Sequence, residues 1–249
     1  MRIPVAPFSV GLCATIAASL LSGCGAEPPI IDPTGVDELT IPTPTPDPAD
    51  FVDEITNPYL PLTPGSTWTY SATSEDGAET ITVTVLDQTR LIQGVEATVV
   101  HDVVTDEDGG VLEDTYDWFA QDEAGNVWYL GEDTTEYDGK EVSTEGSWEA
   151  GKDGAEAGLA MPAEPRVGDG YRQEYYAGVA EDRAEVLDLE TSLTLTYGVF
   201  DDLLKTEESS PLEPEVVEHK YYAKGTGLVS ERTVAGGDEV VELTTYTKG

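Results

Sequence analysis

The densest group of side chains that could do chemistry is a set of carboxylates around one predicted turn. Asp106 and Asp108 precede the glycines of that turn, and Glu113 and Asp114 follow it. Hard oxygen ligands that converge on a loop are what Ca²⁺ requires. The spacing differs from that of the helix–loop–helix calcium motif, and aspartate is also common in turns because its side chain caps the local backbone. A calcium site at these four residues is one hypothesis, beside an acidic turn with no ligand.

Nucleophiles and nitrogen ligands are sparse. The two histidines, His101 and His219, have no second histidine or cysteine at ligand spacing, which argues against a zinc site. We expect His101 at the end of a strand and both histidines at the surface or rim. No Gly-x-Ser-x-Gly elbow occurs. A glycosidase-type pair of carboxylates is recognised only by its separation in space. The sequence therefore predicts no enzyme and, calcium apart, no cofactor.

Aromatic side chains gather in two stretches of the chain. They could line a cavity for an apolar or sugar ligand. Neighbours on a strand point to opposite faces of the sheet, so at most half of them can face one cavity, and we favour core packing for most of them. The two groups are Trp118, Phe119, Trp128 and Tyr129, then Tyr171, Tyr175, Tyr176, Tyr221 and Tyr222.

The N-terminus has the pattern of an export signal. Arg2 and an apolar run at 10–21 precede Leu-Ser-Gly and Cys24. The run is short for a membrane span, which takes about 20 residues. The segment resembles the lipobox of bacterial lipoproteins, which implies that Cys24 is acylated and becomes the first residue of the mature chain. Cys13, the other cysteine, lies in the segment that would be removed. We therefore expect a lipid anchor at Cys24, on the extracytoplasmic side of a membrane.

The charge balance excludes some partners. Acidic residues outnumber basic ones by 50 to 12, and the formal net charge is −38. A field of this sign repels phosphate backbones and anionic headgroups, so it argues against nucleic acid and against lipid binding by charge. The acids are scattered singly and in pairs, which indicates a solvated surface. The partners we expect are the membrane, through the lipid on Cys24, and an unidentified protein or small apolar ligand.

Composition divides the chain into five parts. Closely spaced prolines before residue 51 predict an extended tether. A later stretch rich in glycine and proline connects two β regions, and we expect part of it to pair or pack, with Trp148 and Met161 as anchors. The predicted parts are a signal peptide (1–23), the tether (24–50), a first β region (51–135), the connection (136–167) and a second β region (168–249).

Both β regions contain short runs of Val, Ile, Thr and aromatic residues separated by turns. At 80–85, threonines alternate with Ile81, Val83 and Val85, as in a half-buried strand. Turns that contain glycine or Asp-Gly join antiparallel neighbours. The longest stretch with helical periodicity, 200–208, covers only about two turns. We predict an all-β fold built from antiparallel meander sheets.

The two β regions resemble copies of one unit. An offset of about 103 residues aligns features of both regions in the same order, with shifts of one residue at turns. Trp118-Phe119-Ala120, for example, then meets Tyr221-Tyr222-Ala223. Chance similarity between β-strands is the alternative. If the duplication is genuine, each copy buries one face, and the copies pack as two sheets or continue as one curved sheet.

Several segments resemble a family of uncharacterised bacterial lipoproteins and secreted proteins. The resemblance covers most of 51–234 and implies an architecture and an extracytoplasmic address, but no activity. More faintly, 221–229 is similar to a segment of other exported β-sheet lipoproteins, some of which form curved, half-closed sheets that hold lipids. The segments that carry the main resemblance are 57–65 (NPYLPLTPG), 117–122 (DWFAQD), 146–151 (GSWEAG) and 171–176 (YRQEYY).

These observations predict a lipid-anchored, extracytoplasmic β-protein that acts as a non-enzymatic binding or interaction module. Two alternatives stay open: a carrier of an apolar or lipid ligand in a concave sheet, and a calcium-dependent protein or enzyme of the cell envelope. A cavity lined by aromatic residues would favour the carrier. Three or more converging carboxylates would favour a metal.

Overall fold

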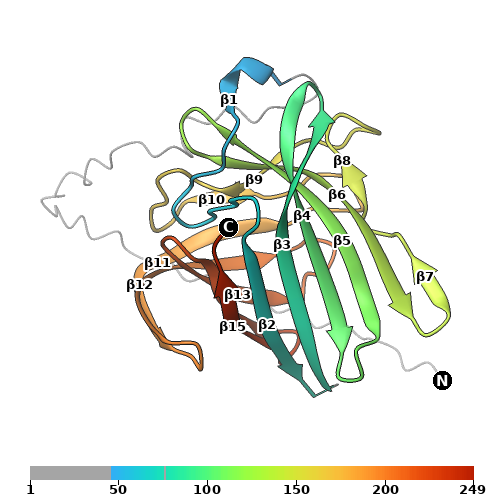
Figure 1. Cartoon of the computed structure of the whole chain (residues 1–249), viewed down its shortest axis with the longest axis vertical. Helices are drawn as coiled ribbons and strands as arrows, with labels where there is room; N and C mark the ends of the chain where they lie inside the picture. Colours follow the sequence, from blue (N-terminus) through green and yellow to red (C-terminus); the bar gives the residue numbers. More distant parts are fainter. Residues whose placement is uncertain (1–45, 76) are drawn as a thin grey trace, which may run out of the picture. The chain divides into compact units, whose positions relative to one another are not determined.

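The computed structural model describes residues 46–75 and 77–249, which belong to one compact unit. Cys24, the signal peptide and most of the predicted tether lie outside these residues. The described chain opens with a short 3-10 helix, Pro48–Asp50 (η1), and is otherwise built from strands and turns (Figure 1). Among the described residues, no helix is long and apolar enough to cross a membrane.

The strands join into one 15-stranded antiparallel sheet, which confirms the predicted all-β fold. The sheet contains two meanders of six strands each, and each meander follows the chain order. The first consists of Thr67–Ser74 (β2), Gly77–Ile92 (β3), Val95–Asp106 (β4), Val111–Asp122 (β5), Val127–Asp138 (β6) and Glu141–Ser143 (β7). The second consists of Gly170–Arg172 (β10), Arg183–Thr194 (β11), Val199–Ser209 (β12), Val217–Ala223 (β13), Gly227–Ala235 (β14) and Val240–Thr247 (β15).

Three short strands extend the first meander. Phe51–Val52 (β1) pairs with β5, while Trp148–Glu149 (β8) and Gly158–Met161 (β9) pair with β6. Trp148 and Met161 were the predicted anchors of the connection, and their side chains are 4% and 0% exposed. Part of the glycine-rich connection is therefore paired and packed, as predicted.

The last strand of the chain joins the two meanders. β15 pairs with β2, so that Leu243 lies opposite Tyr70. At the other end, the backbone N–H of Glu156 donates to the carbonyl of Tyr175 at 2.8 Å, which brings the β9 region against the segment that follows β10. A Cβ at Gly158 would lie 1.9 Å from the Gln173 carbonyl oxygen, so this approach requires glycine. The result is a curved sheet whose two arms face each other (Figure 1).

Alternation along the strands defines a concave face. In β2 the side chains of Trp68, Tyr70 and Ala72 are buried, whereas Ser71 and Thr73 are exposed. The larger core cluster combines residues of both meanders and includes Val100, Leu204 and Leu243. Burial of such side chains from both arms stabilises the curvature, because each fully buried apolar side chain contributes about 1.5–3 kcal/mol.

One local prediction was wrong, and the one stretch with helical periodicity is a strand. Residues 200–208, where no helix was predicted, lie in β12. A register shift between β11 and β12 and the positive φ of Asp202 (54°) mark a β-bulge. The bulge leaves Leu203 and Leu204 both buried, which imitates helical periodicity. His101 lies in the middle of β4 and not at its end.

The order of the strands follows the predicted repeat. The offset of about 103 residues places β2 to β7 on β10 to β15 in sequence. The predicted continuation into one curved sheet agrees with the observed sheet. Common ancestry of the two regions stays a prediction.

Candidate functional site

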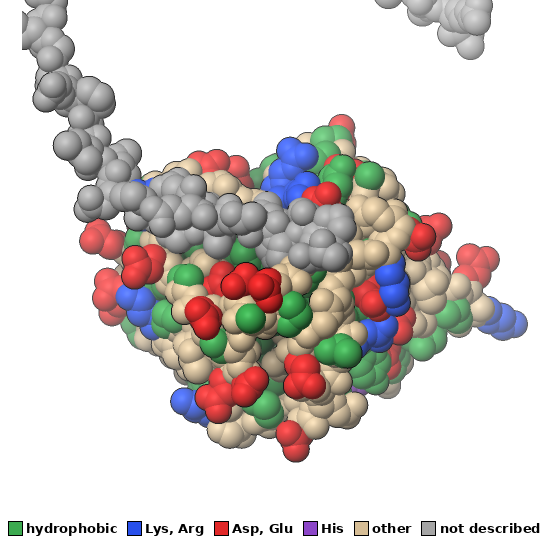
Figure 2. Space-filling view, turned by 90° about the horizontal axis from the view of Figure 1, so that it is seen from above, with side chains coloured by type: hydrophobic (Ala, Val, Ile, Leu, Met, Phe, Trp, Pro, Cys, Tyr) green, Lys and Arg blue, Asp and Glu red, His purple; other side chains and the backbone are tan. Residues whose placement is uncertain are grey.

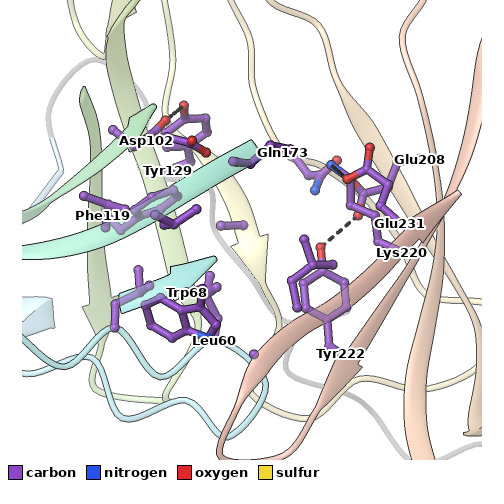
Figure 3. Close-up of a pocket in the computed structure, with 18 of the residues that line it drawn as sticks. Leu60, Trp68, Asp102, Phe119, Tyr129, Gln173, Glu208, Lys220, Tyr222 and Glu231 are labelled. Atoms are coloured by element: carbon purple, nitrogen blue, oxygen red, sulfur yellow. Dashed lines mark hydrogen bonds and ion pairs between the residues drawn. The ribbon is translucent and has the colours of Figure 1, made fainter. Parts of the chain in front are cut away.

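A cavity of about 340 Å³ lies between the two arms of the sheet (Figure 3). Its volume falls near the lower end of the range of about 300–1,000 Å³ that is usual for ligand sites. Strands from both meanders supply its lining, together with the segment that leads into β2. The cavity has an apolar floor and two polar walls that differ in charge.

The apolar floor is built mainly from β2, β5, β14 and the lead-in segment. Trp68, Phe119 and Leu228 line it, and Leu60 closes it from the lead-in (Figure 3). The indole N–H of Trp68 donates to the Thr226 carbonyl at 2.6 Å, which fixes the ring toward the hairpin between β13 and β14. An apolar ligand would therefore meet a preformed surface.

Two buried amides hold the lead-in segment against the sheet. The Asn57 side-chain N–H groups donate to the carbonyls of Gly125 and Pro162, at 3.0 Å each. The Gln121 side-chain oxygen accepts from the backbone N–H groups of Thr56 and Asn57, at 2.8 Å each. Both amides belong to segments that carry the family resemblance, and their contacts position the floor of the cavity.

Three carboxyl groups on β4, β5 and β6 make up the first wall, called here the acidic wall: Asp102 and Asp117 line the cavity, and Glu132 lies beside Asp117, outside the cavity lining. Asp102 pairs with Val83 of β3, and Asp117 lies directly opposite Glu132. Asp102 and Asp117 are diagonal neighbours on one face, because Asp117 pairs with Val100. Like charges directly opposite each other destabilise a sheet, so this wall conflicts with ordinary strand pairing.

A β-bulge at Gly131 brings Glu132 to this wall. The register shifts between Trp118, which pairs with Gly131, and Phe119, which pairs with Tyr129. Gly131 has a φ of 131°, and a Cβ there would lie 2.3 Å from the Trp148 carbonyl oxygen. The bulge puts Tyr129 and Glu132 on the same face although they are three residues apart. The Tyr129 hydroxyl then donates to Asp117 at 2.5 Å and lies 3.2 Å from a Glu132 oxygen.

Burial makes the acidic wall bind protons tightly. Burial, then the neighbouring Asp117 and Glu113, raise the pKa of Asp102 to about 8. Burial and Asp117 raise the pKa of Glu132 to about 8. The pKa of Asp117 rises to about 6, because burial outweighs the hydrogen bond from Tyr129. Much of the negative charge on this wall is therefore neutralised by protons at neutral pH.

The second wall, called here the lysine wall, comes from β12, β13 and β14. The Lys220 ammonium lies 3.0 Å from a Glu208 oxygen and 3.5 Å from a Glu231 oxygen. The hydroxyl of Tyr222 donates to Glu208 at 3.2 Å. Burial alone would lower the pKa of Lys220, but Glu208 and Glu231 outweigh it and raise this pKa well above its ordinary value. The lysine wall thus contains its own counter-charge.

Two oxygen atoms at the cavity receive no hydrogen bond from any described residue. They are Oδ1 of Asp102 and Oε1 of Gln173, and both are buried. Gln173 lies across the cavity from the floor, between the two walls (Figure 3). A buried acceptor without a donor is costly, so both atoms could serve a ligand that carries donors.

The predicted calcium ligands are not gathered into a site. Asp106 caps its own turn, because its carboxylate accepts from the backbone N–H groups of Asp108 and Gly110 at 2.9 and 2.7 Å. Oδ1 of Asp114 lies 3.0 Å from Nε2 of His101, and the Glu113 carboxylate accepts a hydrogen bond from the Thr115 hydroxyl at 2.7 Å. In residues 46–75 and 77–249, no group of three or more His, Cys, Asp or Glu side chains could hold a metal.

The aromatic groups divide between cavity and core. Phe119, Tyr129 and Tyr222 line the cavity, whereas Trp118 and Tyr221 do not. Adjacent aromatic residues on one strand therefore face opposite sides, as expected. The sequence analysis missed Asp102, Glu132 and the lysine wall. Strand alternation could have indicated two of them, because Asp102 shares its face with two valines of β4 and Lys220 shares its face with Tyr222. The bulge at Gly131 hides this pattern for Glu132.

Other acidic side chains are scattered over the molecular surface. On the face that Figure 2 shows, Asp and Glu side chains lie singly or in small groups among apolar and uncharged atoms. This distribution agrees with the solvated acidic surface that the composition indicated. The acidic wall differs from it because its carboxyls are packed inside the sheet.

Comparisons with known proteins give no family assignment. No protein-family model and no curated protein matches the chain. Two solved structures are similar. One is described as an exported protein with a YmcC-like fold from Bacteroides fragilis, with 14% identity, a TM-score of 0.43, and coverage of 76% of this chain and 99% of that one. The other is described as a lipoprotein from Parabacteroides distasonis, with 13% identity, a TM-score of 0.42, and coverage of 76% and 98%.

Proposed function

We propose that this protein is a non-enzymatic binding module that holds one small, mainly apolar ligand in the cavity between the two arms of its sheet. The observation that carries the proposal is the cavity itself, about 340 Å³ in volume, with Trp68, Phe119 and Leu228 on its floor. The resemblance of the segment before Cys24 to a lipobox supports a lipid anchor on the extracytoplasmic side, where such a module would capture or carry its ligand.

The geometry favours binding over catalysis. Asp102, Asp117 and Glu132 have raised pKa values, which are common at catalytic sites. However, no histidine, cysteine or described metal cluster accompanies them at the cavity. Carboxyls that share protons beside an apolar floor are suited to recognising a polar group at one end of a ligand.

A titration with the neutral dye Nile red tests the proposal. The full-length protein should give a saturable rise in dye fluorescence as the dye enters the apolar cavity. Ala160 lines the cavity and is only partly exposed, so Ala160→Phe should fill the space and weaken binding by about tenfold or more, the value of a few buried methylene groups.

A matched variant controls for the added aromatic ring. Ala235 is exposed at the end of β14 and lies outside the cavity, so Ala235→Phe should leave the dissociation constant unchanged. Circular dichroism and thermal melting would show that both variants fold. Absence of saturable dye binding, or equal binding by Ala160→Phe and the native protein, would overturn the proposed function.

A further inference from the structure

Resting on the proposed function, we infer that the ligand carries a protonated primary or secondary amine, which the acidic wall binds while the apolar remainder lies on the floor. The inference concerns the polar end of the ligand. It follows from the carboxyl groups of the acidic wall, which have no lysine or arginine partner, from its free acceptors and from its contrast with the lysine wall.

The acidic wall lacks a cation of its own. None of the ion pairs among the described residues joins Asp102, Asp117 or Glu132 to a lysine or arginine. Glu174 and Asp182 also line the cavity, which adds to its negative charge. An ammonium group placed here would favour the charged form of these carboxyls and would replace the protons that neutralise much of the wall at neutral pH, because opposite charges interact more strongly away from bulk water.

The hydrogen-bonding groups fit an ammonium. A primary ammonium has three N–H donors and no acceptor. At the cavity, Asp102 Oδ1 and Gln173 Oε1 are buried acceptors that receive no hydrogen bond from the described part of the chain. Asp117 accepts one hydrogen bond from Tyr129 and has lone pairs to spare. Hydrogen bonds to charged groups are the stronger kind, so these acceptors would select an ammonium over a hydroxyl.

An ammonium group fits the acidic wall better than a bare metal ion does, because apolar side chains lie next to the carboxyls. Phe119 and Val83 flank the carboxyls, and both line the cavity. Ca²⁺ needs six to eight oxygen ligands around it, whereas the described carboxyls form no group of three that could hold a metal. An ammonium needs acceptors on one side only and can direct its alkyl chain to the apolar floor.

Competition against Nile red can test the inference with three ligands of one chain length: n-octylamine, 1-octanol and octanoate. At pH 7 in moderate salt, octylamine should displace the dye at a concentration about tenfold or more below that of octanol, as a charge-assisted hydrogen bond predicts. Octanoate should compete most weakly. Asp102→Asn should remove most of the advantage of the amine and leave octanol unchanged.

A charge-matched variant separates the wall from the general negative field. Asp133 follows Glu132 on β6 and is exposed, so Asp133→Asn removes the same charge outside the cavity. The preference for octylamine should survive in Asp133→Asn. If octanol and octylamine displace the dye equally, or if Asp133→Asn acts like Asp102→Asn, the inference is wrong although the proposed function stands. If Nile red itself does not bind, the proposed function fails.

Discussion

The two walls of the cavity are built from the same kind of strands but balance charge differently. On the lysine wall, the Lys220 ammonium lies within 3.5 Å of two carboxylates and balances the charge of one of them. On the acidic wall, Asp117 lies opposite Glu132, and only the hydroxyl of Tyr129 stands between them. The first arrangement contains a cation that the chain itself supplies. The second is stable only with bound protons or with a cation from outside, which is why we assign ligand recognition to it.

The predicted repeat places one residue of each wall at equivalent positions of the two meanders. The alignment that places Trp118 on Tyr221 also places Asp117 on Lys220. At equivalent positions of the two meanders, one copy therefore has an acid and the other a base. If the two regions descend from one unit, one copy has exchanged a base for an acid, or the other an acid for a base, at the position that faces the cavity.

The largest effect should come from removing the internal cation. Lys220→Met leaves Glu208, whose side chain is buried, without its partner. Breaking a buried pair on one side costs about 3–5 kcal/mol, so the free energy of unfolding in urea should fall by that order. Adding Glu208→Gln should restore part of the loss.

Lys140→Met is the matched control for this change. Lys140 is exposed in the turn between β6 and β7, and its replacement should alter stability by less than about 0.5 kcal/mol. Equal losses for Lys140→Met and Lys220→Met would mean that the lysine wall is not a compensated cluster, and the contrast between the walls would disappear.

Asp102→Asn should raise the free energy of unfolding, by less than Lys220→Met lowers it. The pKa of Asp102 rises from 3.8 to about 8 on folding, so the folded protein holds this proton more tightly than the unfolded chain. Its contribution to stability is fully present below about pH 4 and is lost as pH rises to about 8. The variant should therefore lose less stability between pH 4 and pH 8. At pH 8 its free energy of unfolding should exceed that of the native protein by about 1 kcal/mol or more.

Thermal or urea unfolding between pH 4 and pH 9 would measure this difference. The groups that face Asp102 are Asp117 and Glu113 of β5, Glu231 of β14 and Tyr70 of β2, and all of them are present in both proteins. The comparison of the two pH profiles therefore isolates Asp102. A variant that is less stable than the native protein at pH 8 would show that the carboxylate is satisfied and would contradict the description of the acidic wall.

Local pattern predicted much of the fold. Turns with glycine and the alternation of threonine and valine predicted the meanders, and the hairpin of β5 and β6 has such a glycine, Gly125, in its turn. The pattern failed where a bulge broke the period of two, as at Asp202 in β12. A bulge depends on the register of the neighbouring strand, which the local sequence does not contain.

The candidate site was harder to predict, because it is made by contacts distant in sequence. Pairing of Leu243 with Tyr70 joins the meanders, and only then do Asp102 and Lys220 line one cavity. The sequence did show that acids cluster near the β4–β5 turn. It could not show that Asp106 turns back on its own loop while Asp117 points into the cavity.

Native mass spectrometry of the protein isolated without denaturation tests the central claim most directly. We predict an added mass that corresponds to one small organic molecule, retained by Ala235→Phe and absent from Ala160→Phe. Extraction of that molecule should show an amine on an apolar body. An unliganded mass for the native protein isolated from the cells that produce it, or the same added mass on Ala160→Phe, would contradict the claim that this cavity is the binding site.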